Sequence, residues 1–452
     1  MTNFTFDELI SKLEKLNGKS LGDLNLSEKS IDKKGSLGLL VEETLLGYNV
    51  GPRSSADILH LGIEIKVTPV IKKSKGFISK ERLVLNIINY CDENWDDFFE
   101  SSLWRKNQKL LITFYESKEG VNRSDFKILA SIIYSFPEID LRIIINDWSK
   151  IASKVKSGLA HELSESDGIF LGACTKGANS LTVRNQPFSS IMAKQRAYSL
   201  KQSYMTSVFN DYVLGNKADE RIIRDINALN SLTLEEYIVT KIKPYYGMTQ
   251  SELIIKFNLQ KSRSSKAINS LIIQRILGVS IDIEKTDEFR KAAIKPKTVR
   301  IEHDGLIKEH MSFPTFRFCE IVVQSWEESD LIQLLTETRF MFIIFTGVKG
   351  KKDYTLSNIR FWSISESEKS ECQRVWEKTV NVLNKGLEII EVNGRIITNL
   401  PKSSESEVMH VRPHATNRDD TYPLPDGREL TKQCFWFNRN FVLKIVKPIK
   451  FE

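Results

Sequence analysis

The sequence predicts an α/β protein of two similar domains, each with a central mixed sheet flanked by helices. Three observations support this prediction. The chain has 452 residues, a length typical of two domains. Segments with the spacing of amphipathic helices alternate with short β-branched runs that are typical of strands. Five stretches of the first half recur in the same order about 230 to 238 residues later, which indicates a duplicated domain.

The elements of the first half follow from the spacing of apolar residues. Residues 6–16 place Leu9, Leu13 and Leu16 on one helical face, and Ser20 with Asp23 predicts a short helical turn. A third amphipathic helix is expected over residues 37–45, and a fourth over 148–162. Strands are expected at residues 61–67, 83–88, 109–114, 141–145 and 169–174.

The second half repeats the first faintly. The paired stretches are 18–24 with 247–253, 34–45 with 266–277, 109–114 with 339–344, 170–179 with 407–417, and 198–204 with 435–441. A charged segment containing Asn210, Gly215 and Asn216 separates the halves. We therefore expect domains at residues 1–212 and 233–452, joined by a linker at 213–232.

Composition bounds the compartment and the partners. The net charge of +7 permits nucleic acid as a partner without proving it. The five cysteines are scattered, which fits reduced thiols better than a disulfide framework or a zinc site. The N-terminus lacks the features of a signal peptide, and no apolar run reaches about 18 residues. A cytoplasmic protein without a membrane span is expected.

A short stretch around residue 60 combines two acids and a lysine. Asp57 and Glu64 are seven residues apart, and Lys66 follows two residues later. On a strand, Glu64 and Lys66 point to the same side. Carboxylate oxygens suit Mg²⁺ better than zinc, and Glu42, on the preceding helix, adds a third carboxylate. The alternative is a set of surface salt bridges.

The second copy lacks these side chains. Glu42 corresponds to Gln274, and Glu64 and Lys66 align approximately with Thr298 and Arg300. Because the repeated scaffold does without the acids, we expect the first domain to be catalytic and the second to be a binding copy.

Other candidate sites are weaker. His410 and His414 are four residues apart, but Pro413 lies between them and no third ligand is near, so a polar loop is favoured over a metal pair. Residues 347–352 form a basic turn, either a solvated loop or a phosphate contact. The basic and aromatic stretches after residues 170 and 194 are either a solvated edge or contacts to DNA. The sequence has no phosphate-binding glycine loop and no G-x-S-x-G.

Taken together, residues 34–42, Asp57 and residues 61–69 resemble the MutH-type GATC endonucleases. The shared pattern is a K-G-x-x-G-x-x-x-E helix followed by D-x₆-E-x-K on a strand. The resemblance implies a restriction-endonuclease-like (PD-(D/E)XK) fold in both domains, the second being degenerate. It also implies that Glu42, Asp57 and Glu64 bind Mg²⁺ and that Lys66 positions or activates water.

The resemblance further implies contacts to DNA. The family's recognition loop reads R-P-K-A. The first copy keeps only its lysine, Lys176, whereas the second copy reads R-P-H-A at residues 412–415. The family's Y-L-R-K-S-F element is similar to residues 199–204, with serine in place of the tyrosine. The DNA-contacting residues implied in this way are Lys34, Lys106, Lys176, Ser199, Lys201, Arg412 and His414.

The sequence therefore predicts an effector-activated (type IIE) restriction endonuclease that cuts double-stranded DNA at GATC with Mg²⁺. The C-terminal domain would bind a second site, and two chains would associate on the palindrome because each has one centre. No nucleotide cofactor is expected. One alternative is a mismatch-repair nicking enzyme, for which a single domain would suffice. The other is a non-catalytic DNA-binding regulator, against which the intact acid set argues.

Overall fold

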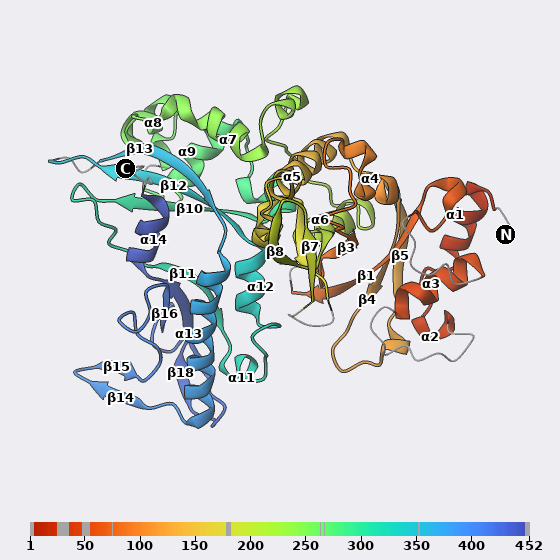
Figure 1. Cartoon of the computed structure of the whole chain (residues 1–452). Helices are drawn as coiled ribbons and strands as arrows, with labels where there is room; N and C mark the ends of the chain where they lie inside the picture. The colour runs from red at the N-terminus through yellow and green to blue at the C-terminus, as the bar shows by residue number, and fades with distance from the viewer. Residues whose placement is uncertain are drawn as a thin grey trace. The chain divides into compact units, whose positions relative to one another are not determined.

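The computed structural model describes residues 4–24, 36–47, 55–74, 76–177, 182–262, 264–265, 267–350 and 353–447. The chain is a mixed α/β protein (Figure 1). It forms two compact units that are interleaved in sequence. The first extends to Tyr237 and also contains Val279–Ile294; the second contains Ile238–Gly278 and the chain from Lys295 onward.

The first unit contains a four-stranded mixed sheet of order β2-β1-β4-β5. Strand β1 (Glu64–Lys73) pairs in parallel with β4 (Leu110–Glu116) and antiparallel with β2 (Gly76–Ser79), while β5 (Ile128–Tyr134) pairs antiparallel with β4. Helices α1 (Phe6–Glu14), α2 (Leu21–Leu24) and α3 (Ser36–Leu46) lie close together beside this sheet (Figure 1). Their apolar faces form one core with Ile63, Ile65 and Leu111.

A second, antiparallel sheet of the first unit has the order β3-β9-β6. Its strands are β3 (Leu83–Ile87), β9 (Arg196–Leu200) and β6 (Leu171–Thr175). A hairpin of β7 (Val183–Gln186) and β8 (Ser189–Lys194) separates β6 from β9 in sequence. The main helices of this part are α4 (Ser102–Asn107), α5 (Glu138–Lys156), α6 (Gln202–Tyr212) and α10 (Asp287–Ala292).

The second unit also has two main sheets. One has the order β10-β12-β13, made of β10 (Ile294–Ile301), β12 (Arg339–Gly347) and β13 (Tyr354–Trp362). The other has the order β11-β19-β16, made of β11 (Met311–Phe316), β19 (Gln433–Phe437) and β16 (Met409–Pro413). The helices of the second half are α7 (Leu234–Ile242), α8 (Gln250–Lys256), α9 (Ile268–Leu277), α11 (Phe318–Ile321), α12 (Asp330–Glu337), α13 (Glu366–Lys385) and α14 (Arg439–Val446). Two small hairpins, β14 (Ile389–Val392) with β15 (Arg395–Thr398) and β17 (Thr421–Pro423) with β18 (Glu429–Thr431), complete it.

The mixed α/β architecture confirms the predicted fold class, and the antiparallel sheets of the two halves are arranged alike. In each antiparallel sheet the last strand in sequence is the central one. The final residue of β9, Leu200, pairs with the first residue of β6, Leu171, and the final residue of β19, Phe437, pairs with the first residue of β16, Met409. A backbone hydrogen bond also recurs. The Gly18 N–H donates to the Ile128 carbonyl at 2.8 Å, and the Gly247 N–H donates to the Leu356 carbonyl at 2.9 Å.

One predicted element is wrong. Residues 141–145 were expected to form a strand, but they belong to helix α5. The apolar run looked like a buried strand, whereas Ile143, Ile144, Trp148 and Ile151 are buried with the spacing of one helical face. Strand β5 and helix α10 were not expected. The predicted domain limits at 1–212, 213–232 and 233–452 stay a prediction.

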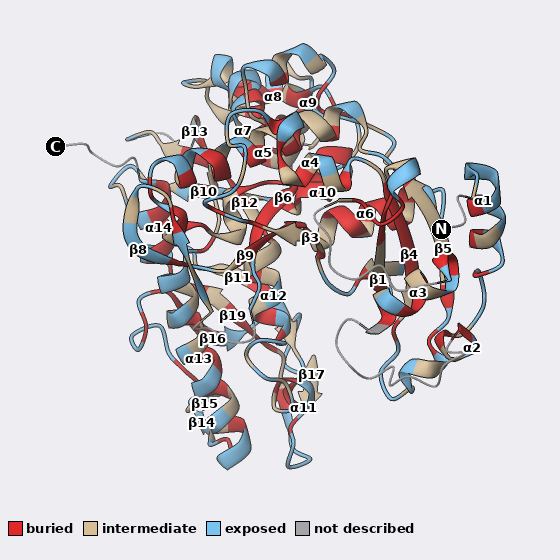
Figure 2. Cartoon of the chain, turned by 45° about the vertical axis from the view of Figure 1, so that its right-hand side comes forward, coloured by how far each residue is buried: buried red, intermediate tan, exposed pale blue. Residues whose placement is uncertain are grey.

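Burial follows the sheets. Figure 2 shows buried residues concentrated along β1 and β4 and exposed ones on the outer faces of the helices. Leu110, Leu111, Ile112 and Phe114 of β4 are all fully buried. No helix within the described ranges is long and apolar enough to span a membrane.

Candidate active site at the start of strand β1

Asp57 is brought to β1 by a tight local loop. The backbone of Ile58 bridges to Ile63, a single 3-10 turn (Leu59–Leu61) lies between them, and Gly62 closes the loop with φ +63°. That value lies in the left-handed region that glycine adopts without strain. The loop returns Asp57 to the strand, where its Oδ2 accepts a hydrogen bond from the Ile65 N–H at 2.9 Å. Asp57 is buried, so its carboxylate is held in a fixed position.

Glu64 and Lys66 lie on the same side of β1, as expected. The Lys66 Nζ donates to Glu64 Oε1 at 2.8 Å, and Glu64 is only 3% exposed. Lys66 Nζ also donates to the Leu85 carbonyl at 2.9 Å. Leu85 lies where the pairing of β3 with β9 is irregular, between Val84 and Ile87. Such bulges release a backbone group from the ladder and are frequent beside active sites.

Lys106 joins the same cluster from helix α4. Its Nζ lies 3.4 Å from Glu64 Oε1, and its side chain is only 13% exposed. The helix begins at an N-cap, Ser101, whose side chain accepts from the Trp104 N–H. The sequence predicted a DNA contact for Lys106; the structure places its charge beside the acidic residues, where a scissile phosphate would also be close to it.

Glu42 faces this cluster from helix α3, which packs against β1. Burial, followed by repulsion from the carboxylates of Asp57 and Glu64, raises the pKa of Glu42 to about 7. Lys66 and Lys106 act in the opposite direction. Burial also raises the pKa of Glu64, although Lys66 opposes this. The structure therefore brings together Glu42, Asp57, Glu64 and Lys66, and adds Lys106.

The carboxylates fit a hard divalent cation. Glu64 Oε2 is buried and has no hydrogen-bond partner among the described residues, and a buried carboxylate oxygen without a partner is costly. Burial and, after it, repulsion from Asp57 and Glu64 raise the pKa of Glu42, and a bound cation would relieve that repulsion. No three His, Cys, Asp or Glu side chains within the described ranges form a complete ligand set by themselves. Mg²⁺ commonly binds through one or two carboxylates and keeps several waters, so such a set is not needed.

The remaining predicted DNA contacts of the first unit differ in exposure. Lys176 is exposed directly after β6. Ser199 and Lys201 are buried, at 2% and 7% exposure, because they lie on and directly after the central strand β9. The Ser199 hydroxyl donates to the Gly172 carbonyl at 3.5 Å. Both side chains would have to become exposed to touch DNA. Lys34 lies outside the described residues.

In the second unit a half-buried tryptophan, Trp436, lies beside the two predicted contacts. The Arg412 guanidinium lies 5.1 Å from the ring centre of Trp436, and the His414 ring meets the same indole edge-on at 5.3 Å. Both Arg412 and His414 are exposed. Trp436 was not predicted; the alternation of the strand Gln433–Phe437 placed it opposite the buried Phe435 and Phe437 and could have identified it. His410 does not lie in the expected polar loop: it is buried on β16, where its Nδ1 lies 2.6 Å from Asn438 Oδ1.

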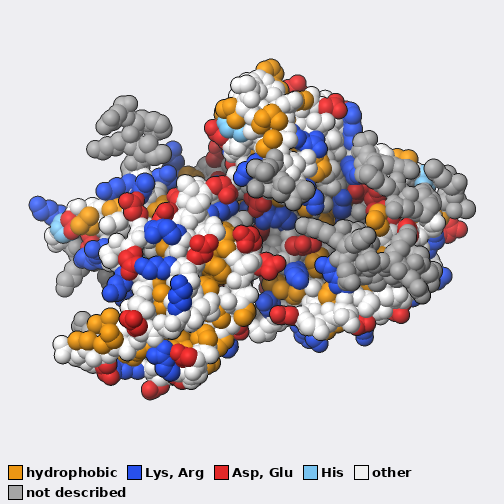
Figure 3. Space-filling model, turned by 60° about the horizontal axis from the view of Figure 1, so that its bottom comes forward, with side chains coloured by type: hydrophobic (Ala, Val, Ile, Leu, Met, Phe, Trp, Pro, Cys, Tyr) orange, Lys and Arg blue, Asp and Glu red, His pale blue; other side chains and the backbone are white. Residues whose placement is uncertain are grey.

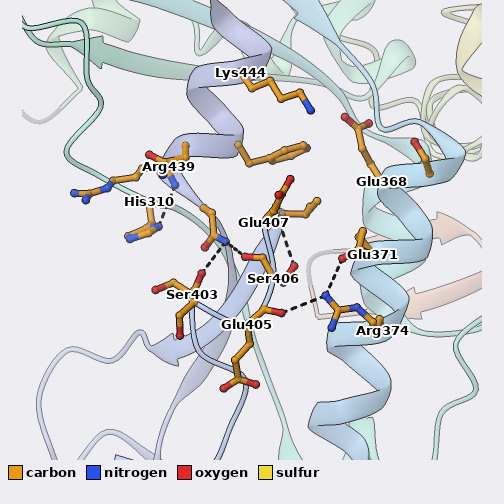
Figure 4. Close-up of a pocket in the computed structure, with 16 residues that line it drawn as sticks. His310, Glu368, Glu371, Arg374, Ser403, Glu405, Ser406, Glu407, Arg439 and Lys444 are labelled. Atoms are coloured by element: carbon orange, nitrogen blue, oxygen red, sulfur yellow. Dashed lines mark hydrogen bonds and ion pairs between the residues drawn. The ribbon is translucent and has the colours of Figure 1, made fainter.

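Among the other described residues, we find no cluster of acidic and basic side chains comparable to the one at the start of β1. Figure 3 shows Lys and Arg side chains interspersed with Asp and Glu on the face in view. A cleft of about 1170 Å³ in the second unit lies between α13, residues 403–408 and α14 (Figure 4). Arg374 in this cleft is already held by Glu371 at 2.9 Å and by the Glu405 carbonyl at 3.2 Å. Strand β10, the counterpart of β1, contains no acidic residue.

Comparison with known proteins agrees with this geometry. The family model of the DNA mismatch repair enzyme MutH matches residues 46–147. The MutH protein of Shewanella woodyi is 29% identical over 215 residues, which is 46% of this chain and 91% of the relative. The MutH protein of Shewanella sp. strain ANA-3 is 26% identical over 180 residues, 39% of this chain and 79% of the relative.

A longer match extends over both halves. The type II restriction enzyme Sau3AI of Staphylococcus aureus is 34% identical over 474 residues, which is 96% of each chain. The MutH match covers the strand that carries Glu64 and Lys66, while this one also includes the repeated second half. The chain therefore belongs to the family of the type II restriction enzyme Sau3AI and contains a MutH-type module in its first half.

Proposed function

We propose that this endonuclease cuts double-stranded DNA at 5′-GATC-3′ by Mg²⁺-dependent hydrolysis of one phosphodiester bond in each strand. The observation that carries the proposal is the buried contact of Lys66 with Glu64 at 2.8 Å, beside Asp57 and electrostatically coupled to Glu42. Strand β10 has no acid at all. The fold therefore does not need these acids for its stability, and their presence in one copy favours catalysis.

The proposed roles follow from where each group lies. Asp57, Glu64 and Glu42 would hold Mg²⁺, whose positive charge would offset the negative charge on the reacting phosphate. Lys66 would orient and activate a water for in-line attack on phosphorus. Lys106, whose Nζ lies 3.4 Å from Glu64 Oε1, would help to stabilise the same negative charge. The bond from phosphorus to O3′ breaks, O3′ takes up a proton, and the products carry a 5′-phosphate and a 3′-hydroxyl.

The second unit is proposed to bind another copy of the site and to activate the first. Arg412 lies over the ring of Trp436 and His414 meets that ring edge-on, so a cation and an imidazole are presented at the end of β16, the kind of surface that contacts bases and phosphates. In this proposal residues 1–212 form the catalytic domain, 213–232 the linker and 233–452 the effector domain. Since the described residues of one chain contain a single acid cluster of this kind and GATC is palindromic, two chains would associate on the DNA.

A second candidate is a nicking activity like that of the MutH relatives. The match of the MutH family model to the residues around the acid cluster favours it, and one centre per chain would suffice. The extent of the match to Sau3AI over 96% of both chains favours the restriction enzyme instead.

Supercoiled plasmids with no, one or two GATC sites separate these possibilities. With Mg²⁺ we expect linear product from the one-site plasmid, faster cutting of the two-site plasmid, and no cutting without a site. Persistent nicked circles would support the nicking enzyme, and equal rates on one and two sites would contradict the effector role. Plasmids methylated on adenine or cytosine, digested in parallel, define the sensitivity to modification.

A further inference from the structure

A segment from the second half of the sequence forms part of the first unit. Residues Val279–Ile294 follow helices α8 and α9 in sequence, yet they pack with the first unit. Helix α10 (Asp287–Ala292) lies against α6. Its Lys291 Nζ is 3.0 and 2.9 Å from the two carboxylate oxygens of Asp140 on α5, and 2.8 Å from Asp287 Oδ2. Because the side chains of Lys291 and Asp140 are only 4% and 2% exposed, this ion pair is shielded from solvent.

Two buried tyrosines extend the ion pair toward α6. The Tyr204 hydroxyl donates to Asp140 Oδ2 at 2.9 Å, and the hydroxyls of Tyr204 and Tyr134 are 2.6 Å apart. The Ser203 hydroxyl donates to the Lys291 carbonyl at 2.7 Å. Buried polar networks of this kind fix the elements that they join when each member is satisfied.

Two further side chains of α10, Arg290 and Glu288, also contact the first unit. Arg290 pairs with Asp211 at the C-terminal end of α6, at 2.5 Å. The Glu288 carboxylate accepts from the N–H groups of Ile222 and Ile223 at 2.9 to 3.2 Å. Helix α6 is therefore held along its length by a segment that lies about 80 residues later in the chain.

Helix α6 in turn is joined to β2, which pairs with β1, and to β9, which pairs with β3. The Gln202 side chain donates to the Ser79 carbonyl at 2.7 Å, and Thr206 Oγ1 accepts from the Ser79 N–H at 2.9 Å. Ser79 ends β2, which pairs with β1. At its N-terminus α6 continues from β9, which pairs with β3, and the Leu85 carbonyl of β3 accepts the hydrogen bond from Lys66.

We propose that Val279–Ile294 is a positioning element of the catalytic unit, and that Lys291 on Asp140 keeps Lys66 against Glu64 through α6. The expected effect on DNA cleavage rests on the proposed function, whereas the positioning of Lys66 does not. It also gives the second half of the chain a role in the first centre besides DNA binding. Helix α10 leads directly into β10 of the second unit through Ala293, whose φ of +51° is strained for a residue with a Cβ.

The test uses the full-length chain with Lys291→Met, which keeps the length of the side chain and removes its charge. Arg221→Met is the matched control, since Arg221 lies 3.3 Å from the same Asp287 but is 47% exposed. Because Lys291→Met leaves Asp140 buried without its cation, the double variant Asp140→Asn/Lys291→Met is prepared as well. Circular dichroism and thermal unfolding select a temperature at which all variants are folded.

The first readout is independent of cleavage. Limited acetylation with acetic anhydride, followed by peptide mass spectrometry, measures how well Lys66 is protected. We expect Lys66 to react at least about 5-fold faster in Lys291→Met and in the double variant, since its surroundings open locally. Arg221→Met should leave Lys66 as protected as in the wild type. Unchanged protection in a folded Lys291→Met or double variant overturns the positioning role.

The second readout is single-turnover cleavage. Displacing Lys66 should lower the rate about 10- to 100-fold in Lys291→Met and in the double variant, while Arg221→Met should cut at the wild-type rate. Wild-type cleavage by a folded Lys291→Met or double variant also contradicts the inference. If the wild type does not cut DNA, the proposed function fails, while the labelling of Lys66 still decides the positioning role.

Discussion

Replacing Glu42 with glutamine should make the metal-free protein more stable at alkaline pH while abolishing its activity. The pKa of Glu42 is raised from 4.5 to about 7, first by burial and then by Asp57 and Glu64. The folded protein therefore holds a proton that the unfolded chain has lost. The stability from this proton is fully present below about pH 4.5 and is lost as the pH rises through about 7.

The raised pKa also sets the magnitude. A change from 4.5 to about 7 corresponds to about 3 kcal/mol at about 1.4 kcal/mol per pH unit. Because Glu42 is partly accessible to solvent, screening reduces this, and we expect about 1 to 2 kcal/mol. Glutamine has a similar shape and no charge to lose, so Glu42→Gln should gain this amount over the wild type at pH 8 and almost none at pH 5.

Urea unfolding in EDTA at pH 5 and pH 8 measures this difference directly. The neighbouring variant Glu43→Gln controls for removing any carboxylate from α3. Addition of Mg²⁺ at pH 8 should stabilise the wild type more than Glu42→Gln, and cleavage should fall at least about 100-fold in Glu42→Gln. A Glu42→Gln protein that is equally stable or less stable at pH 8, or that cuts DNA at the wild-type rate, would refute the coupling of Glu42 to the acid cluster.

Three further predictions concern the other charged side chains. Lys106→Ala removes a cation that lies 3.4 Å from Glu64. In single-turnover kinetics, the rate of DNA cleavage should fall about 10-fold, and the acidic limb of its pH–rate profile should move to higher pH. Unchanged kinetics would contradict this prediction. Arg412→Ala should weaken binding of a GATC duplex by about 1 to 3 kcal/mol in gel-shift titrations with Ca²⁺, more than it weakens a scrambled duplex; equal losses would argue against base contact. Burial lowers the pKa of His410 to about 4, so the wild type should lose stability as the pH falls from 6.5 through about 4. The stability of His410→Gln, measured by urea unfolding, should depend less on pH over that range. An equal pH dependence of the two proteins would contradict this prediction.

The local part of the site was predictable from the sequence because it depends on local geometry. Side chains two apart on a strand share a face, which places Lys66 on Glu64. The tight loop from Ile58 to Ile63 lies within the same stretch of sequence, and so does Asp57. The repeat was predictable because the paired stretches recur in the same order, and both halves end with a central strand followed by a helix, β9 with α6 and β19 with α14.

The rest depends on contacts between residues that are distant in sequence. No local pattern relates Leu85 to Lys66, or Lys106 to Glu64, although these contacts lie 19 and about 40 residues apart. The packing of α10 with the first unit could not be predicted for the same reason, since it depends on a contact between Lys291 and the distant Asp140. Residues 141–145 were assigned to a strand because a short apolar run fits both a buried strand and a helix, and only packing decides between them.

The central claim is that the acid cluster of the first unit cuts DNA at GATC. It is tested most directly with a 5′-labelled duplex containing a single GATC and a matched duplex containing GTAC, incubated with Mg²⁺ and either the wild type or Glu64→Ala. The wild type should cut the GATC duplex to one product with a 5′-phosphate on its partner fragment and leave the GTAC duplex intact. Glu64→Ala should bind the GATC duplex and leave it uncut. Cutting of GATC by Glu64→Ala at the wild-type rate would contradict the assignment of the site.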